Sequence, residues 1–266
     1  RQLRFGVHDR TGEHGLSSET VSPKGRSRPV EGHADGRLGQ TVAGKKSASG
    51  EARRCQPMVN LLEHGGFDGL GADHEEKRLL IGNAGSAMWL VFTANEEYSD
   101  GLPDPLDRWS RRVGEAVAGQ LGARAVFPFD GPPYPPFLGW SLRSGRAFSS
   151  PLGMVIHEKH GLWHAYRFAL EFDEALEQPS RQPGPVSPCL ECREKPCLTA
   201  CPVQAFRGGE YRVETCSGHL SAAEGQDCMQ RGCAARRTCP VAPENQYDSG
   251  EHAAFHMRAF VFRGSR

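Results

Sequence analysis

The sequence has no long apolar run, and none of its stretches approaches the roughly 20 apolar residues that a membrane-spanning helix requires. It also has no excess of charge, because 32 lysines and arginines balance 32 aspartates and glutamates. No segment near the N-terminus has the charged, apolar and small-residue order of a secretory signal. These absences predict a cytoplasmic protein with no membrane span and no nucleic-acid partner.

Large apolar residues are scarce in residues 1–57, where Phe5 is the one aromatic side chain. Such a segment cannot bury enough apolar surface to offset the entropy of ordering it, which predicts disorder. Because Met58 is the first methionine, the segment is predicted to be a disordered tail or a mis-called leader. A basic tail that binds an acidic partner is the alternative.

Residues 58–177 are predicted to form an α+β domain with a mixed or antiparallel sheet. Residues 78–85 and 123–129 are apolar runs typical of strands, and residues 86–97 predict a helix with Ser86 as its cap. A proline-rich loop that leads into a short helix is expected next. Residues 153–172 then predict two strands.

The clearest helix is predicted after Asp104, which is a candidate cap, with Pro105 in the first turn. Its apolar residues recur at helical spacing: Leu106, Trp109, Val113, Val117 and Leu121. A second helix is predicted over residues 249–262 at the C-terminal end. Residues 178–188, rich in proline, serine and glutamine, predict a linker to a module spanning residues 189–266.

Eight of the nine cysteines lie between Cys189 and Cys239, and the ninth is Cys55. This uneven distribution and a reducing compartment favour metal ligation over disulfides. The eight form two sets in sequence, each ending in Cys-Pro. The first set is Cys189, Cys192, Cys197 and Cys201, and the second is Cys216, Cys228, Cys233 and Cys239. Four thiolates can hold a zinc ion or a [4Fe–4S] cluster.

The compact first set with its trailing Cys-Pro favours two [4Fe–4S] clusters over two zinc ions, although the intervals differ from the usual ferredoxin run. In bacterial ferredoxins the last cysteine of such a run serves the other cluster. The same crossing here predicts one cluster on Cys189, Cys192, Cys197 and Cys239. It predicts the other on Cys201, Cys216, Cys228 and Cys233.

The cysteine module, over about residues 186–245, resembles that of epoxyqueuosine reductase and of the reductive dehalogenases. The resemblance lies in the cysteine count, the two Cys-Pro ends and the lone Cys216 between denser groups. Both are cobalamin-dependent reductases. The resemblance therefore implies a small ferredoxin-like dicluster module that passes electrons to an upstream domain.

The upstream domain resembles the cobalamin-processing protein of the methylmalonic aciduria and homocystinuria type C family over about residues 78–172. The similar segments are NAGSAMW at 83–89, DPLDRW at 104–109, and a stretch with Ile156, His157, Gly161, Trp163, Ala165 and Arg167. The resemblance implies a flavoreductase-like sheet-and-helix domain. It also implies that His157, Trp163 and Arg167 lie beside a corrinoid, with core packing as the structural alternative.

The remaining histidines are weaker candidates. His160, His164 and His219 are expected to be solvated, with His219 as a replacement ligand if Cys216 does not bind. His252 and His256 are four residues apart on a predicted helix, but the acidic residue of a zinc-binding helix motif is missing.

Three functions fit these patterns. The first is an iron–sulfur oxidoreductase, with a redox partner protein or small donor and a corrinoid as candidate acceptor. The second is a non-enzymatic electron carrier, favoured by the shortness of the upstream domain. The third is a zinc-stabilised interaction protein. No catalytic residue can be assigned from the sequence.

Overall fold

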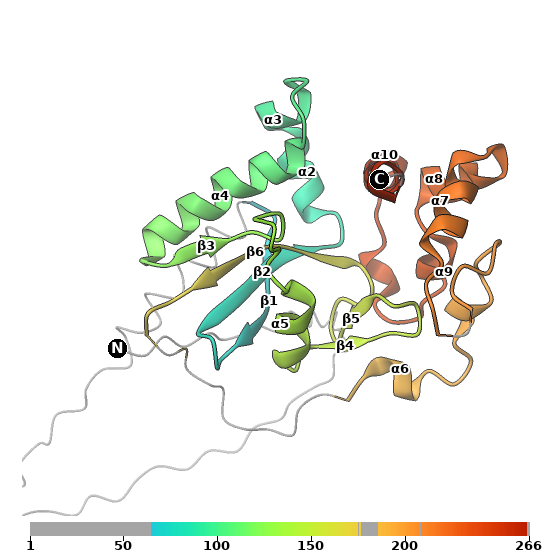
Figure 1. The fold of residues 1–266 in the computed structure, drawn as a ribbon, viewed down its shortest axis with the longest axis horizontal. Coiled ribbons are helices and arrows are strands. Elements are labelled where there is room, and N and C mark those ends of the chain that lie inside the picture. Colours follow the sequence, from blue (N-terminus) through green and yellow to red (C-terminus); the bar gives the residue numbers. More distant parts are fainter. Residues whose placement is uncertain (1–64, 175, 177–185, 208, 265–266) are drawn as a thin grey trace, which may run out of the picture.

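The structure is a computed structural model that describes residues 65–174, 176, 186–207 and 209–264 (Figure 1). The calls on residues 1–57, on Cys55 and on most of the linker therefore lie outside the described residues. The chain has a mixed α+β architecture with small antiparallel sheets, as the sequence predicted. None of the helices in the described residues is long and apolar enough to cross a membrane.

The upstream part is built on a four-stranded antiparallel sheet with strand order β1-β2-β6-β3. Its strands are β1 (Asp68–Asp73), β2 (Arg78–Ala84), β3 (Arg124–Val126) and β6 (His164–Glu171). A separate two-stranded sheet pairs β4 (Ala147–Ser149) with β5 (Val155–His157). The two strands predicted within 153–172 are therefore present, but they belong to different sheets.

Helices cover the two faces of the larger sheet (Figure 1). One face packs against α4 (Pro105–Leu121), where Trp109 and Phe168 enter a common core with Phe67. The other face packs against α5 (Phe137–Arg143), which contributes Phe137 and Trp140. Gly114 lets α4 approach the sheet closely, because a Cβ there would lie 2.9 Å from the ring of Phe127.

The predicted helix over 86–97 divides into α2 (Ala87–Thr93) and α3 (Glu96–Ser99). Ser86 and Asp104 occupy the predicted N-cap positions of α2 and α4, but neither side chain makes a capping hydrogen bond. Asp104 has a φ of 51° and makes no side-chain capping bond, because this left-handed backbone does not aim its carboxylate at the first turn. The Ser86 hydroxyl instead accepts a hydrogen bond from the backbone N–H of Asp248.

The cysteine-rich part consists of short helices and turns. Its α-helices are α6 (Pro188–Glu191), α7 (Val213–Ser221), α8 (Gln226–Arg231), α9 (Ala234–Arg237) and α10 (Gly250–Gly264). Its 3-10 turns are η1 (Pro196–Leu198), η2 (Ala223–Gly225) and η3 (Pro243–Asn245). The predicted C-terminal helix is thus confirmed as α10.

The two parts share a continuous core. Leu152, Ile156 and Leu162 of the upstream part pack with Ala205 and Phe206 of the cysteine-rich part. A second contact is made by α10, which lies between α2 and the α7–α8 pair (Figure 1). Because both contacts bury apolar surface, they fix the cysteines relative to the sheet.

Candidate metal centres

The eight cysteines are free thiols that gather in two groups of four. Burial raises the pKa of the Cys189 thiol, and the nearby thiols of group one raise it further. Burial likewise raises the pKa of Cys216, followed by the effect of its neighbours in group two. Group one is Cys189, Cys192, Cys197 and Cys239. Group two is Cys201, Cys216, Cys228 and Cys233.

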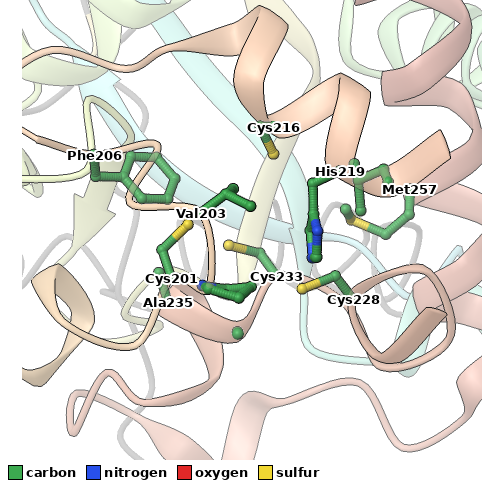
Figure 2. A pocket seen from close by; sticks show the side chains of 12 residues that line it. Cys201, Val203, Phe206, Cys216, His219, Cys228, Cys233, Ala235 and Met257 are labelled. Atoms are coloured by element: carbon green, nitrogen blue, oxygen red, sulfur yellow. The ribbon is translucent and has the colours of Figure 1, made fainter. Parts of the chain in front are cut away.

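Group two surrounds a small cavity that is partly open to solvent. In Figure 2 the four sulfur atoms point toward this space from separate segments. Apart from His219, the other side chains that line the cavity are apolar. They include Val203, Phe206, Leu220, Ala235 and Met257. An apolar cavity ringed by thiols suits a group that bonds sulfur at several points.

Backbone turns place each trailing cysteine. Cys201 and Cys239 are both followed by Pro-Val and then by a residue with φ of 50°, Gln204 and Ala242 respectively. After Cys201, this left-handed turn lets the backbone N–H of Ala205 donate to Cys201 Sγ at 3.3 Å. The backbone N–H of Val241 donates to the Cys239 thiol. The shared Cys-Pro-Val sequence was a signal of this repeat that the cysteine spacing alone did not reveal.

The electrostatics of the sites favour neutral thiols when no metal is bound. Burial is the main cause that raises the pKa of Cys189, Cys197, Cys216, Cys233 and Cys239. Backbone N–H groups of Ala235 and Arg236 act against this effect at Cys233. A bound metal would supply the positive charge that deprotonates the thiols, so metal binding and proton release are coupled.

Among the described residues, no group of three or more His, Cys, Asp or Glu side chains is placed to hold a metal ion. A tetrahedral zinc ion draws its four sulfur ligands to within about 4 Å of one another. A cubane cluster instead presents a different iron to each cysteine, so its ligands stand farther apart. The donor set and the apolar cavity of group two fit the cluster.

His157 lies at the end of β5 and is held by the backbone. Its Nε2 lies 3.2 Å from the carbonyl oxygen of Leu70, and its Nδ1 accepts from the N–H of Lys159 at 3.1 Å. Burial, together with neighbouring His160 and His164, lowers its pKa to about 3. These contacts occupy both ring nitrogens of His157.

Trp163 and Arg167 are also engaged by protein groups. The indole of Trp163 is 1% exposed, with the guanidinium of Arg236 4.2 Å from its ring centre. Arg167 donates to Asp107 Oδ1 at 2.6 Å and to Ser110 Oγ at 3.0 Å, both on α4. His157, Trp163 and Arg167 thus contact three different sets of partners.

Three of the other histidines were expected to be solvated, and two of them are not. His160, in the turn before β6, and His164, the first residue of β6, are buried rather than solvated, because both rings pack beside His157. His219 lines the cavity of group two (Figure 2). The Nε2 atoms of His252 and His256 lie 3.1 Å apart, and the ring of Tyr247 stacks on both histidines.

Sequence reasoning missed two residues beside the thiols. Tyr211 lies close to Cys216. The backbone N–H of Arg236 contacts Cys233, and its guanidinium lies over the rings of Trp163 and Tyr247. Neither residue belongs to a cysteine motif. A comparison with models of protein families gave no match, and a comparison with curated proteins gave none either.

Proposed function

We propose that this protein is an iron–sulfur redox protein whose two groups of four cysteines each bind a [4Fe–4S] cluster. The observation that carries the proposal is the sorting of eight thiols into two crossed groups of four. Cys201 is placed with Cys216 and not with its sequence neighbour Cys197. This crossing is the arrangement that two-cluster ferredoxins use.

The clusters would supply one-electron transfer, and the chain would hold them away from water. The cluster of group one would be bound by cysteines in the turns around α6 and η1, together with Cys239. The cluster of group two would be bound by Cys201 together with cysteines on α7, on α8 and directly before α9. The amide donors to Cys201, Cys233 and Cys239 would hydrogen-bond the ligand sulfurs and stabilise the bound state.

The electron acceptor in this proposal lies in or near the upstream domain. A flavoreductase-like fold with a corrinoid partner is the finer form of the proposal, and it rests on the resemblance of residues 78–172. His157, Trp163 and Arg167 are the corrinoid candidates. A corrinoid would have to compete with the protein contacts of these three side chains.

A second candidate function is a non-enzymatic electron carrier. The observation that favours it is the engagement of the same three residues by Leu70, Arg236 and Asp107. In this case the upstream domain would act as a scaffold, and the partner would be a redox protein. A zinc-stabilised interaction protein is the third candidate, since four thiolates can also hold a zinc ion, and the metal assays below distinguish it from the two redox functions.

The test is anaerobic purification of the full chain, followed by absorption spectroscopy and assays for iron, sulfide and zinc. We expect a brown protein with about eight irons and eight sulfides per chain, as two four-iron clusters require. A colourless protein with two zinc ions would contradict both redox functions. Cobalamin is then added: a shift of the corrinoid spectrum supports the reductase, and an unchanged spectrum supports the carrier.

A matched pair of variants makes the cobalamin test specific. Arg167→Lys keeps the charge at the candidate position, whereas Arg167→Met removes it. If a corrinoid contacts Arg167, the Met variant should weaken the spectral shift more than the Lys variant does. Equal shifts in both variants would place any corrinoid elsewhere.

A further inference from the structure

The helix α5 is apolar on its outer face as well as on its inner face. Phe137 and Trp140 are buried where the inner face packs on the sheet. Leu138 and Leu142 point the other way and are 62% and 43% exposed. Residues four apart share a helix face, so these two leucines form a continuous apolar surface. A helix that covers a sheet normally carries polar residues there.

The loop that leads into α5 extends this apolar surface. The side chain of Tyr134 is 65% exposed, four residues before Leu138. Exposed prolines of the loop are Pro132, Pro133 and Pro136. Proline and tyrosine lose little conformational freedom when a partner covers them. We call Tyr134, Leu138, Leu142 and these three prolines the α5 patch.

The α5 patch offers no charge to a partner. Residues 131–142 contain no charged side chain. Arg143 follows at the end of α5, and its guanidinium donates to Asp73 Oδ2 at 2.6 Å, which neutralises it. A nucleic acid or a strongly charged protein would find nothing to pair with on this surface. A second copy of the chain would instead meet a neutral surface like its own, without repulsion.

The spacing of the patch suits a two-fold axis. Leu138 lies midway between Tyr134 and Leu142 in the sequence. If an antiparallel copy places Leu138 against its own counterpart, each Tyr134 meets the Leu142 of the other chain. Gly139 lies beside this centre, and a Cβ there would meet only the tip of Arg143, at 3.8 Å. Its missing side chain lets two α5 helices approach closely where they cross.

We propose that the α5 patch is the interface of a homodimer in which two α5 helices cross antiparallel about a two-fold axis. The proposal goes beyond the iron–sulfur function and does not depend on it. The patch has six residues, whereas standard interfaces use about 20–30 residues a side. We therefore expect a weak dimer that forms as the protein concentration rises.

The test is sedimentation velocity of the full chain over a wide range of concentrations. Leu138→Glu places two like charges at the axis and should weaken the dimer by about tenfold or more. The control is Leu90→Glu, the same change at a leucine that is 71% exposed on α2, away from α5 (Figure 1). It should leave the dimer unchanged. Circular dichroism checks that each variant is folded.

A mixture of two variants tests the two-fold axis itself. Leu138→Glu and Leu138→Lys should each be mainly monomeric alone, because each repels its own copy. Mixed together, they should form a dimer, because opposite charges then meet at the axis. Two variants that dissociate but do not combine would rule out contact between the two copies of residue 138.

Other results would also overturn the proposal. A chain that stays monomeric at every concentration would mean that a different protein, or none, covers the patch. A dimer that survives Leu138→Glu would place the interface elsewhere. Equal weakening by Leu90→Glu would show that the effect is not specific to α5. Iron content is assayed separately, so failure of the iron–sulfur function is a distinguishable result.

Discussion

Cys239 is buried with thiols that lie far from it in the sequence. It acts on Cys189 and Cys197, while Cys233, a near neighbour on the other side of α9, belongs to group two. The four residues of α9, Ala234–Arg237, therefore separate the ligands of two different sites. A substitution at Cys239 should affect the site of the distant cysteines rather than that of its neighbour.

Cys239→Ser is expected to remove the group one cluster and leave the group two cluster in place. The iron content should fall to about half, because one of two four-iron clusters is lost. The measurement is an iron assay together with the resonance spectrum of the reduced protein. Thr238→Ser, at an exposed neighbour, is the control. Retention of the signal assigned to Cys189, Cys192 and Cys197, with loss of the other, would contradict the crossed ligand groups.

The crossed arrangement of the cysteines was predicted from the ferredoxin pattern, in which the last cysteine of a run serves the other cluster, whereas the short intervals alone would have grouped Cys201 with Cys197. The position of Tyr211 near Cys216 could not be predicted, because a single tyrosine outside any motif has no periodicity or spacing to mark it. The burial of His160 and His164 was missed for a related reason. Both rings pack beside His157, whose Nε2 contacts the carbonyl oxygen of Leu70, and only the folded chain brings β1 next to this segment.

At the scale of single elements, α4 illustrates how one glycine can set the distance between a helix and a sheet. A Cβ on Gly114 would meet the ring of Phe127 at 2.9 Å and the ring of Phe168 at 3.1 Å. Gly119 lies on the exposed side of the same helix, with nothing within 4 Å of its Cβ position. The two glycines therefore form a matched pair.

Gly114→Ala is expected to lower the free energy of unfolding by about 1–2 kcal/mol, because two buried rings must move to accept the methyl group. Gly119→Ala should raise it by about 0.5–1 kcal/mol, since alanine restricts the unfolded chain and fits a helix. Urea unfolding followed by circular dichroism measures both. Destabilisation by both substitutions, or by neither, would contradict the close contact between α4 and the sheet.

Elements with a strong periodic pattern were predicted well, and short elements were not. The apolar spacing of α4 and the apolar run of β2 gave both elements to within a residue or two. β1 contains two glycines and two aspartates among its six residues and has no clear alternation, so it was missed. Its strand conformation depends on pairing with β2, which is a tertiary contact.

At the scale of the whole molecule, buried neutral histidines join the upstream and cysteine-rich parts. His252 of α10 stacks between Trp89 of α2 and Tyr247, with ring centres at 4.7 Å and 3.8 Å. His256 contacts the same tyrosine ring. Burial, with a smaller effect of the Arg236 charge, lowers the pKa of His252 to about 4, and burial together with His252 and Arg236 lowers that of His256 to about 3. This contact therefore requires uncharged imidazoles.

The whole protein is expected to lose stability in acid between about pH 6.5 and about pH 4. Burial also lowers the pKa of His157 to about 3 and that of His164 to about 4, from an ordinary value of 6.5. Below pH 6.5 these histidines bind protons in the unfolded chain but stay neutral in the folded chain, so the free energy of unfolding falls as the pH falls. Each such histidine contributes at most about 1.4 kcal/mol per pH unit.

Urea unfolding at pH 7, 6 and 5, followed by tryptophan fluorescence, measures this dependence. Visible absorbance follows the loss of any bound cluster separately, so cluster loss and unfolding are distinguished. His256→Phe should make the dependence less steep, because it removes one titrating group while retaining a ring beside Tyr247. A free energy of unfolding that stays constant from pH 7 to pH 5 would show that these histidines are not held neutral. In that case the contact between α10 and α2 would not be weakened by acid, contrary to what its imidazole rings imply.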